Sequence, residues 1–327
     1  MEGLRELDSL EVIAVVDNSI ATWSDPERKD VQRFFNWVKE EGDKEKPILV
    51  ADRGLCLHLQ ATCDDEVYTI LYDTGDSPRN LANNVEALGL DLSSVDAIVL
   101  SHGHMDHFGG LLWSLKTIGK KTLPVYVHPW MFLKKGFEIE RPEGKKIREM
   151  ERMPSEAEIM NVGGKIVSTT EPVLLGNGLL MRTGEVPRNT SYEKGMSSHR
   201  VFLDGEWKKD AEIRDDVGLV AKVKDRGLVV ISGCSHAGII NIIQEMQRLT
   251  GESRIHGLIG GLHLAGGVTK ETMQQTIKMM QEIKPNLLVP CHCTGWRARH
   301  LMSAEMPNEY VEGSVGHKYI IGGSDVS

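Results

Sequence analysis

Four potential metal ligands occur within six positions, and this segment constrains the chain more than any other. Residues 101–107 read SHGHMDH and directly follow an apolar run, AIVL, that is typical of a buried strand. In extended backbone His102 and His104 point to the same side, so both can bind one ion. Asp106 and His107 begin the next turn and can serve a second ion. Because imidazole and carboxylate suit zinc, iron or manganese, the segment predicts a metal-binding loop after a strand.

Composition narrows the class of protein further. The 327 residues are 40% hydrophobic and 26% charged, which is ordinary for a globular chain with a large core. The net charge of −9 argues against a nucleic-acid partner, whereas bound metal ions could still attract a small anionic substrate. The chain has no apolar run of about 18 residues and its start lacks signal-peptide features, so we expect a cytoplasmic protein without a membrane partner. Self-association into a homo-oligomer stays open.

The pattern of elements predicts an α/β fold. Short runs rich in β-branched residues predict strands at residues 11–16, 55–60, 67–72, 97–100, 124–128, 228–232, 257–260 and 286–290. Apolar spacing predicts helices within residues 24–46 and from residues 80, 109, 237 and 270. We therefore expect two sheets sandwiched between helices, in a single domain over residues 1–327. The highly charged segment 131–160 is predicted to be a cap insertion in that domain.

The histidine loop resembles the His-x-His-x-Asp-His signature of the metallo-β-lactamase superfamily. Residues 71–75, LYDTG, are similar to the strand–Asp–Gly element that precedes it in that family. Other short segments resemble those of one branch of the superfamily, the 7,8-dihydropterin-6-yl-methyl-4-(β-D-ribofuranosyl)aminobenzene-5′-phosphate synthase-like proteins. They are RGLC at 53–56, TGEVPR at 183–188, SGCSHAG at 232–238, GGLHL at 260–264 and PCHCTG at 290–295. The resemblance implies an αββα sandwich of the metallo-β-lactamase type, with two metal ions at one edge.

The resemblance also implies metal ligands after two later strands. Where the superfamily usually presents a bridging aspartate, this chain has Cys234, with His236 two positions on. A thiolate can replace a carboxylate on zinc, but Cys234 would also suit core packing and His236 a helix cap. The last histidine ligand of the superfamily corresponds to His292. The cysteines beside it, Cys291 and Cys293, are predicted to pack inside, with a Cys-x-Cys zinc site as the alternative.

Several substrate-facing positions keep alternatives open. Glu185 stands where the superfamily often has a histidine, so it either coordinates a metal, contacts substrate or is an exposed hinge residue. His263 lies among glycines at a strand end and is predicted to bind substrate or protonate the leaving group, unless it caps a helix. Arg188 and Arg200 suit phosphate recognition, although solvated charge explains them equally well. The isolated histidines, His199 among them, are assigned structural roles.

Together these residues predict a metal-dependent enzyme. Two divalent transition-metal ions, zinc first and iron or manganese next, would activate a bridging water and polarise the substrate. Asp106 and His263 are the predicted catalytic residues. We expect a hydrolase acting on a small anionic substrate such as a phosphoester, a lactone or a β-lactam-like compound. The alternatives are a pterin-branch synthase or transferase, a di-iron redox protein, and a binding module without turnover.

Overall fold

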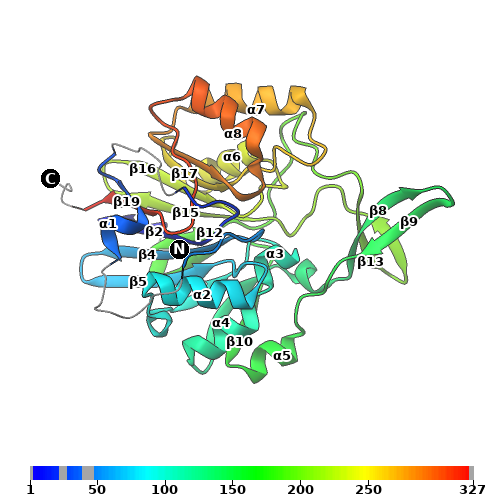
Figure 1. Cartoon of the computed structure of the whole chain (residues 1–327), viewed down its shortest axis with the longest axis horizontal. Coiled ribbons are helices and arrows are strands. Elements are labelled where there is room, and N and C mark those ends of the chain that lie inside the picture. Colours follow the sequence, from blue (N-terminus) through cyan, green and yellow to red (C-terminus); the bar gives the residue numbers. More distant parts are fainter. Residues whose placement is uncertain (1–2, 22–27, 39–47, 324–327) are drawn as a thin grey trace.

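The computed structural model describes residues 3–21, 28–38 and 48–323, and it arranges them in four main layers (Figure 1). Two sheets lie face to face in the middle, and helices cover both outer faces. One sheet is covered by α6 (Ile239–Thr250), α7 (Lys270–Ile283) and α8 (Trp296–Glu305). The other is covered by α2 (Pro78–Leu88), α4 (Leu111–Ile118) and α5 (Glu156–Asn161). The predicted αββα sandwich is confirmed.

The first central sheet is built mainly from the second half of the chain, and three of its neighbouring strands are parallel. In the described residues its order is β11 (Val173–Leu175), β12 (Leu180–Arg182), β15 (Gly218–Val223), β16 (Gly227–Ser232), β17 (Ile255–Gly261) and β18 (Leu287–Cys291). The short β1 (Glu6–Leu7) also pairs with β15. Every residue of β16 is buried, as expected for a strand with layers on both faces.

The second central sheet is built mainly from the first half of the chain. Its order is β10 (Gly164–Ser168), β7 (Leu123–Val127), β6 (Ala97–Val99), β5 (Glu66–Tyr72), β4 (Cys56–Cys63), β2 (Ser9–Val16), β19 (Lys318–Gly322) and β3 (Val31–Gln32). Buried side chains from both sheets, including Leu59 and Ile231, form one continuous core between them. Burial of this apolar surface fixes the two sheets against each other.

Local sequence signals set the ends of the helices that cover the sheets. The hydroxyl of Ser77 accepts a hydrogen bond from the backbone of Asn80 at the start of α2, and Pro78 takes the first helical position. The same helix ends at Gly89, whose φ of 64° is the left-handed conformation common after helices. The side chain of Thr269 caps α7 in the same way as Ser77 caps α2. These caps explain why α7 spans the range that its apolar spacing predicts.

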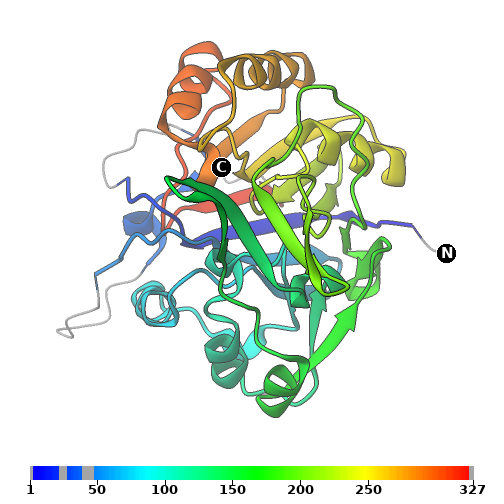
Figure 2. The same cartoon turned by 90° about the vertical axis from the view of Figure 1, so that its right-hand side faces the viewer.

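A third, four-stranded sheet projects from one end of the sandwich, and we call it the extension. Its order is β14 (Glu206–Lys209), β13 (His199–Leu203), β8 (Lys135–Arg141) and β9 (Gly144–Glu149). Figure 2 turns this end toward the viewer, and the extension lies in front of both halves of the molecule. The predicted insertion, 131–160, matches it only in part, because α5 at the end of that range packs on the core and β13 and β14 come from later in the chain. That the extension acts as a cap stays a prediction.

One predicted helix is wrong within the described residues. The apolar spacing over residues 24–46 gives only the short α1 (Phe34–Trp37), and residues 31–32 form β3 instead. Pairing of these two residues with β19 at the sheet edge outweighs their helical spacing. The rest of that range, 24–27 and 39–46, lies outside the described residues. In the described part of the chain, no helix is both long and apolar enough to span a membrane.

Candidate metal centre

The loops that leave four strands meet at one edge of the sandwich. In the first sheet β16, β17 and β18 are parallel neighbours, so their carboxyl ends lie side by side. From the second sheet, β6 leads into the histidine loop and the short α3 (Met105–Phe108). Strand ends of this kind are where open α/β sheets place their binding sites. The fold therefore gathers the predicted ligands although they are distant in sequence.

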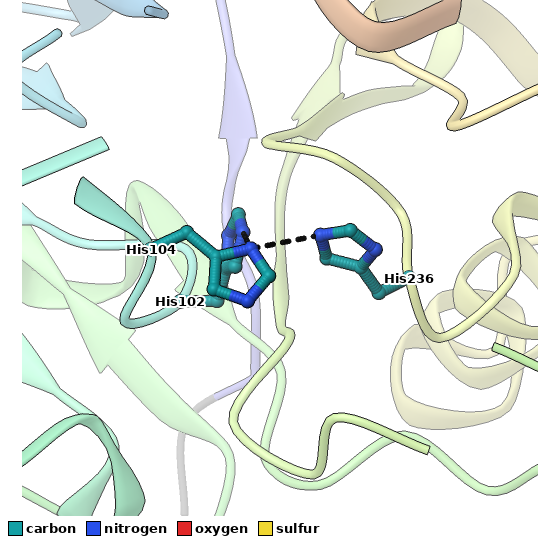
Figure 3. A group of neighbouring side chains, drawn as sticks. All are labelled: His102, His104 and His236. Atoms are coloured by element: carbon teal, nitrogen blue, oxygen red, sulfur yellow. Dashed lines mark hydrogen bonds between the residues drawn. The ribbon is translucent and has the colours of Figure 1, made fainter. Parts of the chain in front are cut away.

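Three buried histidines from both sheets form the first ligand group (Figure 3). Nε2 of His102 lies 3.0 Å from Nδ1 of His104, which in turn lies 3.2 Å from Nε2 of His236. Burial, together with the charges of neighbouring histidines, holds the pKa of all three well below its usual value, and Lys135 adds to this effect at His102 and His104. Neutral rings cannot satisfy three converging nitrogens by mutual hydrogen bonds alone. This arrangement fits a bound transition-metal ion.

A second group combines one carboxylate with two histidines. Asp106, His107 and His292 present ligand atoms within 4.8 Å of one another. Nε2 of His292 lies 3.6 Å from Oδ2 of Asp106, and neither buried ring nitrogen of His292 has a hydrogen-bond partner among the residues that the structure describes. An unpaired, buried imidazole is costly, and a metal ion would satisfy it. The donor set therefore fits a second ion.

The orientation of His107 depends on a buried aspartate. Its Nδ1 lies 2.7 Å from Oδ2 of Asp73, which leaves Nε2 directed toward the other candidate ligands. Asp73 also accepts hydrogen bonds from the backbone and hydroxyl of Ser101 at 2.7 and 2.8 Å. Burial lowers the pKa of His107, but Asp73 and Asp106 outweigh it and raise the value to about 9. A carboxylate behind a ligating histidine is a common arrangement in metal sites.

Cys234 lies between the two groups. Its Sγ is 3.2 Å from Nε2 of His107, and it also belongs to a set with His236 and His263 and to another with His292 and Cys293. The side chain is buried, and burial raises the pKa of its thiol well above the ordinary value. Its position matches that of a residue shared by two ions. The packing role considered from the sequence does not require this central location.

His263 and Cys293 complete the rim of the cluster. The ring centroid of His263 is 4.3 Å from that of His236, and its buried Nδ1 has no hydrogen-bond partner within residues 3–21, 28–38 and 48–323. Cys293 was predicted to pack inside, but it lines the cavity beside Cys234 and His263. The reason is the left-handed φ of 49° at His292, which breaks the extended alternation. Cys291, in contrast, is buried in the core as predicted.

The groups open into a cavity of about 380 Å³ under the extension. Its floor includes His104, Asp106 and His263, and its opposite wall includes Phe137 and Arg148 from the extension. The volume falls in the range of small-molecule sites. The arrangement can therefore hold two ions beneath a small substrate.

Sequence reasoning missed a histidine that the extension contributes. Nε2 of His199 lies 3.3 Å from Nε2 of His104, while its Nδ1 lies 3.1 Å from the carbonyl oxygen of Asp210. If Nδ1 donates to that carbonyl, Nε2 is free to accept a hydrogen bond from His104. His199 has no companion residue in the sequence, so no spacing could have identified it. It is therefore not the structural histidine that was predicted.

Two predicted substrate contacts require correction. Glu185 lies 3.3 Å from Nε2 of His128 and lines a different hollow, so it joins none of the ligand groups found in the described residues. The guanidinium of Arg188 donates to the carbonyl oxygens of Val186 and Glu212, which directs it away from the cavity.

The guanidinium of Arg200, the other arginine predicted to bind phosphate, also has partners within the protein. It pairs with Glu138 at 2.8 Å and donates to the carbonyl oxygens of Ser197 and His199. Neither it nor Arg188 lines the cavity beside the ligand groups.

Comparison with known proteins agrees with this geometry. The sequence profile described as the metallo-beta-lactamase superfamily matches residues 64–292, which include both ligand groups and Cys234. The chain belongs to the metallo-β-lactamase superfamily. It is 29% identical, over 80% of its length and 87% of the relative, to 7,8-dihydropterin-6-methyl-4-(beta-D-ribofuranosyl)-aminobenzene-5'-phosphate synthase of Methanocaldococcus jannaschii. It is 32% identical to an uncharacterized protein of the same organism, over 76% of this chain and 86% of that one.

Solved structures confirm the superfamily fold. A metal-dependent hydrolase of the β-lactamase superfamily aligns with a TM-score of 0.71 and 24% identity, over 96% of this chain and all of that one. A diphosphatase of the PhnP family aligns with a TM-score of 0.50 and 12% identity, over 96% of this chain and 98% of that one. At these identities the likeness concerns the fold.

The contact between His199 and His104 predicts a loss of metal affinity in His199→Ala. Removal of a group that orients a ligating histidine typically weakens metal binding about 10- to 100-fold, and we expect a loss in that range. Competition with a chromophoric chelator would measure it, with circular dichroism to verify the fold. His58→Ala, which removes a buried histidine of β4 outside the ligand groups, is the matched control. Equal metal affinity in both variants would contradict the contact's importance.

Proposed function

We propose that this member of the metallo-β-lactamase superfamily is a dinuclear metal-dependent hydrolase of a small anionic substrate. The bond cleaved would be a phosphoester, a lactone or a related group. Zinc is the first candidate metal, with iron and manganese next, because the donor set is mainly imidazole with carboxylate and thiol. The observation that carries the proposal is the pair of buried ligand groups on either side of Cys234.

Each ligand group has a separate role in the proposal. His102, His104 and His236 would hold one ion, and Asp106, His107 and His292 the other, with Cys234 between them. Bound ions would polarise the substrate and activate water, which is the chemistry that two-metal sites supply. Asp73 would keep His107 in the tautomer that directs Nε2 toward the site, through its 2.7 Å contact with Nδ1.

Proton transfer to the leaving group is assigned to His263. It lines the cavity next to His236, and its Nδ1 has no partner in the described residues. A histidine at this rim can reach a substrate held over the ligand groups. Asp106, with one oxygen 3.6 Å from His292, would orient the attacking water as well as hold an ion.

A second candidate is a synthase that uses the same groups without consuming water. The observation in its favour is the 29% identity to the Methanocaldococcus jannaschii protein that is named a synthase. The hydrolase proposal draws on the likeness to a structure named a metal-dependent hydrolase. The two candidates differ in the fate of water, which an isotope experiment detects.

The two-group arrangement predicts metal contents for three variants. The wild type should bind close to two ions per chain, His102→Ala and His292→Ala about one each, and the double variant close to none. Each single variant removes a ligand from a different group. Elemental analysis of protein purified without chelators measures this. The control is His300→Ala, which removes a side chain that stacks on Trp296. An absence of metal in the wild type, or unchanged content in both single variants, would refute the proposal.

Turnover in ¹⁸O-labelled water tests hydrolysis directly. A panel of phosphodiesters, lactones and β-lactams identifies a substrate, and mass spectrometry then follows its products. A hydrolase incorporates one ¹⁸O atom per bond cleaved, because the nucleophile comes from water. Products without ¹⁸O, in which two substrates have been joined, would instead establish the synthase. His292→Ala should abolish turnover in either case, so it controls for background chemistry.

A further inference from the structure

Three residues of the extension form one row across its strands. In the register of β13, β8 and β9, His199 lies opposite Phe137, and Phe137 lies opposite Arg148. Residues directly opposite on neighbouring strands present their side chains on the same face. At the inner end of the row His199 contacts His104, at 3.3 Å between the Nε2 atoms. Phe137 and Arg148 both line the cavity.

Along this row the side chains change from imidazole to an apolar ring and then to a positive charge. The Phe137 ring centroid is 6.2 Å from that of His104 and 5.7 Å from that of His199, so an apolar surface begins directly beside the ligand groups. Met150 and Met196 also line this cavity and extend that surface. The guanidinium of Arg148 follows at the outer end. Strand spacings of roughly 4.8 Å place the backbone of Arg148 about 10 Å from that of His199.

Two of the charged side chains at the mouth of the cavity, Arg53 and Glu149, have partners of opposite charge, whereas Arg148 has none among the described residues. Arg53 forms two hydrogen bonds with Asp76, at 2.6 and 3.0 Å, and Glu149 lies 3.8 Å from Lys134. In the described part of the chain, no ion pair or side-chain hydrogen bond involves Arg148. Glu151 also lines the mouth without an ion pair to any described residue, but it lies beyond the end of β9 and outside the row. An unpaired guanidinium at the end of an apolar surface suits an anion.

We infer that Phe137 and Arg148, with His199 buried behind them at the inner end of the row, form a substrate subsite for a flat apolar group that ends in an anion. The inference rests on the proposed function, because the reacting end of the substrate would lie at the metal-binding histidines. The flat group would pack on Phe137, and a carboxylate or phosphate would reach Arg148. The subsite replaces Arg188 and Arg200 as the part of the chain that selects a charged substrate.

Three small probes test the subsite. Benzohydroxamate carries a metal-binding head and a flat ring, 4-carboxybenzohydroxamate adds an anion at the far end, and 4-(aminomethyl)benzohydroxamate adds a cation there. Isothermal titration calorimetry on metal-loaded protein gives the dissociation constants. An arginine–carboxylate bond is among the stronger polar contacts, so the carboxylate should tighten binding about tenfold over the unsubstituted ring. The aminomethyl group should give no such gain.

Variants assign that gain to individual residues. Arg148→Ala should remove the advantage of the carboxylate and leave the affinity for benzohydroxamate unchanged, whereas Phe137→Ala should weaken all three probes. Arg141→Ala, an exposed arginine of the same hairpin that does not line the cavity, is the matched control and should change nothing.

Other outcomes overturn the inference in distinguishable ways. Equal binding of the anionic and unsubstituted probes to the wild type would refute the subsite but would not contradict the proposed metal-dependent function. If the wild type prefers the cationic probe and Glu151→Gln loses that preference, the mouth of the cavity binds cations and the inferred anion subsite is wrong. If no hydroxamate binds the wild type and no metal is present, the proposed function fails and the subsite fails with it.

Discussion

The buried carboxylate of Asp73 is the interaction on which the rest of the site depends. It accepts from the backbone and hydroxyl of Ser101 and contacts Nδ1 of His107, so it joins the end of β5 to both ends of the histidine loop. Bonds to a charged acceptor contribute about 1.5–3 kcal/mol each, and their loss would leave a buried charge unpaired. The chain after the histidine loop packs closely against the segment that follows Asp73. A Cβ at Gly109 would lie 2.0 Å from the carbonyl oxygen of Asp76, so this position requires glycine.

The extension is tied to the same loop by a second buried carboxylate. Asp215 accepts a 2.8 Å hydrogen bond from the backbone of Gly103 and forms a close ion pair with Lys135, the first residue of β8. Burial would raise the pKa of Asp215, but Lys135 lowers it below the ordinary value. Breaking a buried pair of this kind costs about 3–5 kcal/mol. The wall of the cavity and the first ligand group are therefore positioned together, which makes the extension part of the site.

The sequence predicted the sandwich and the ligand loop because both depend on local pattern. The spacing of His102 and His104 after an apolar run, and the position of His292 after another, are visible within a few residues. His199 and Arg148 could not be predicted, because their roles follow from the register of the extension and not from their neighbours in sequence. The direction of the Cys293 side chain depends on the left-handed backbone of His292. A histidine at that position does not indicate such a conformation from sequence.

Location of the bound ions by anomalous X-ray diffraction of metal-loaded crystals tests the central claim most directly. We expect two peaks roughly 3.5–4 Å apart, the separation typical of two-metal sites. One should be bonded to His102, His104 and His236, the other to Asp106, His107 and His292, with the Sγ atom of Cys234 close to both. A single peak bonded to Cys234 and Cys293, with His102 and His104 free of metal, would contradict it.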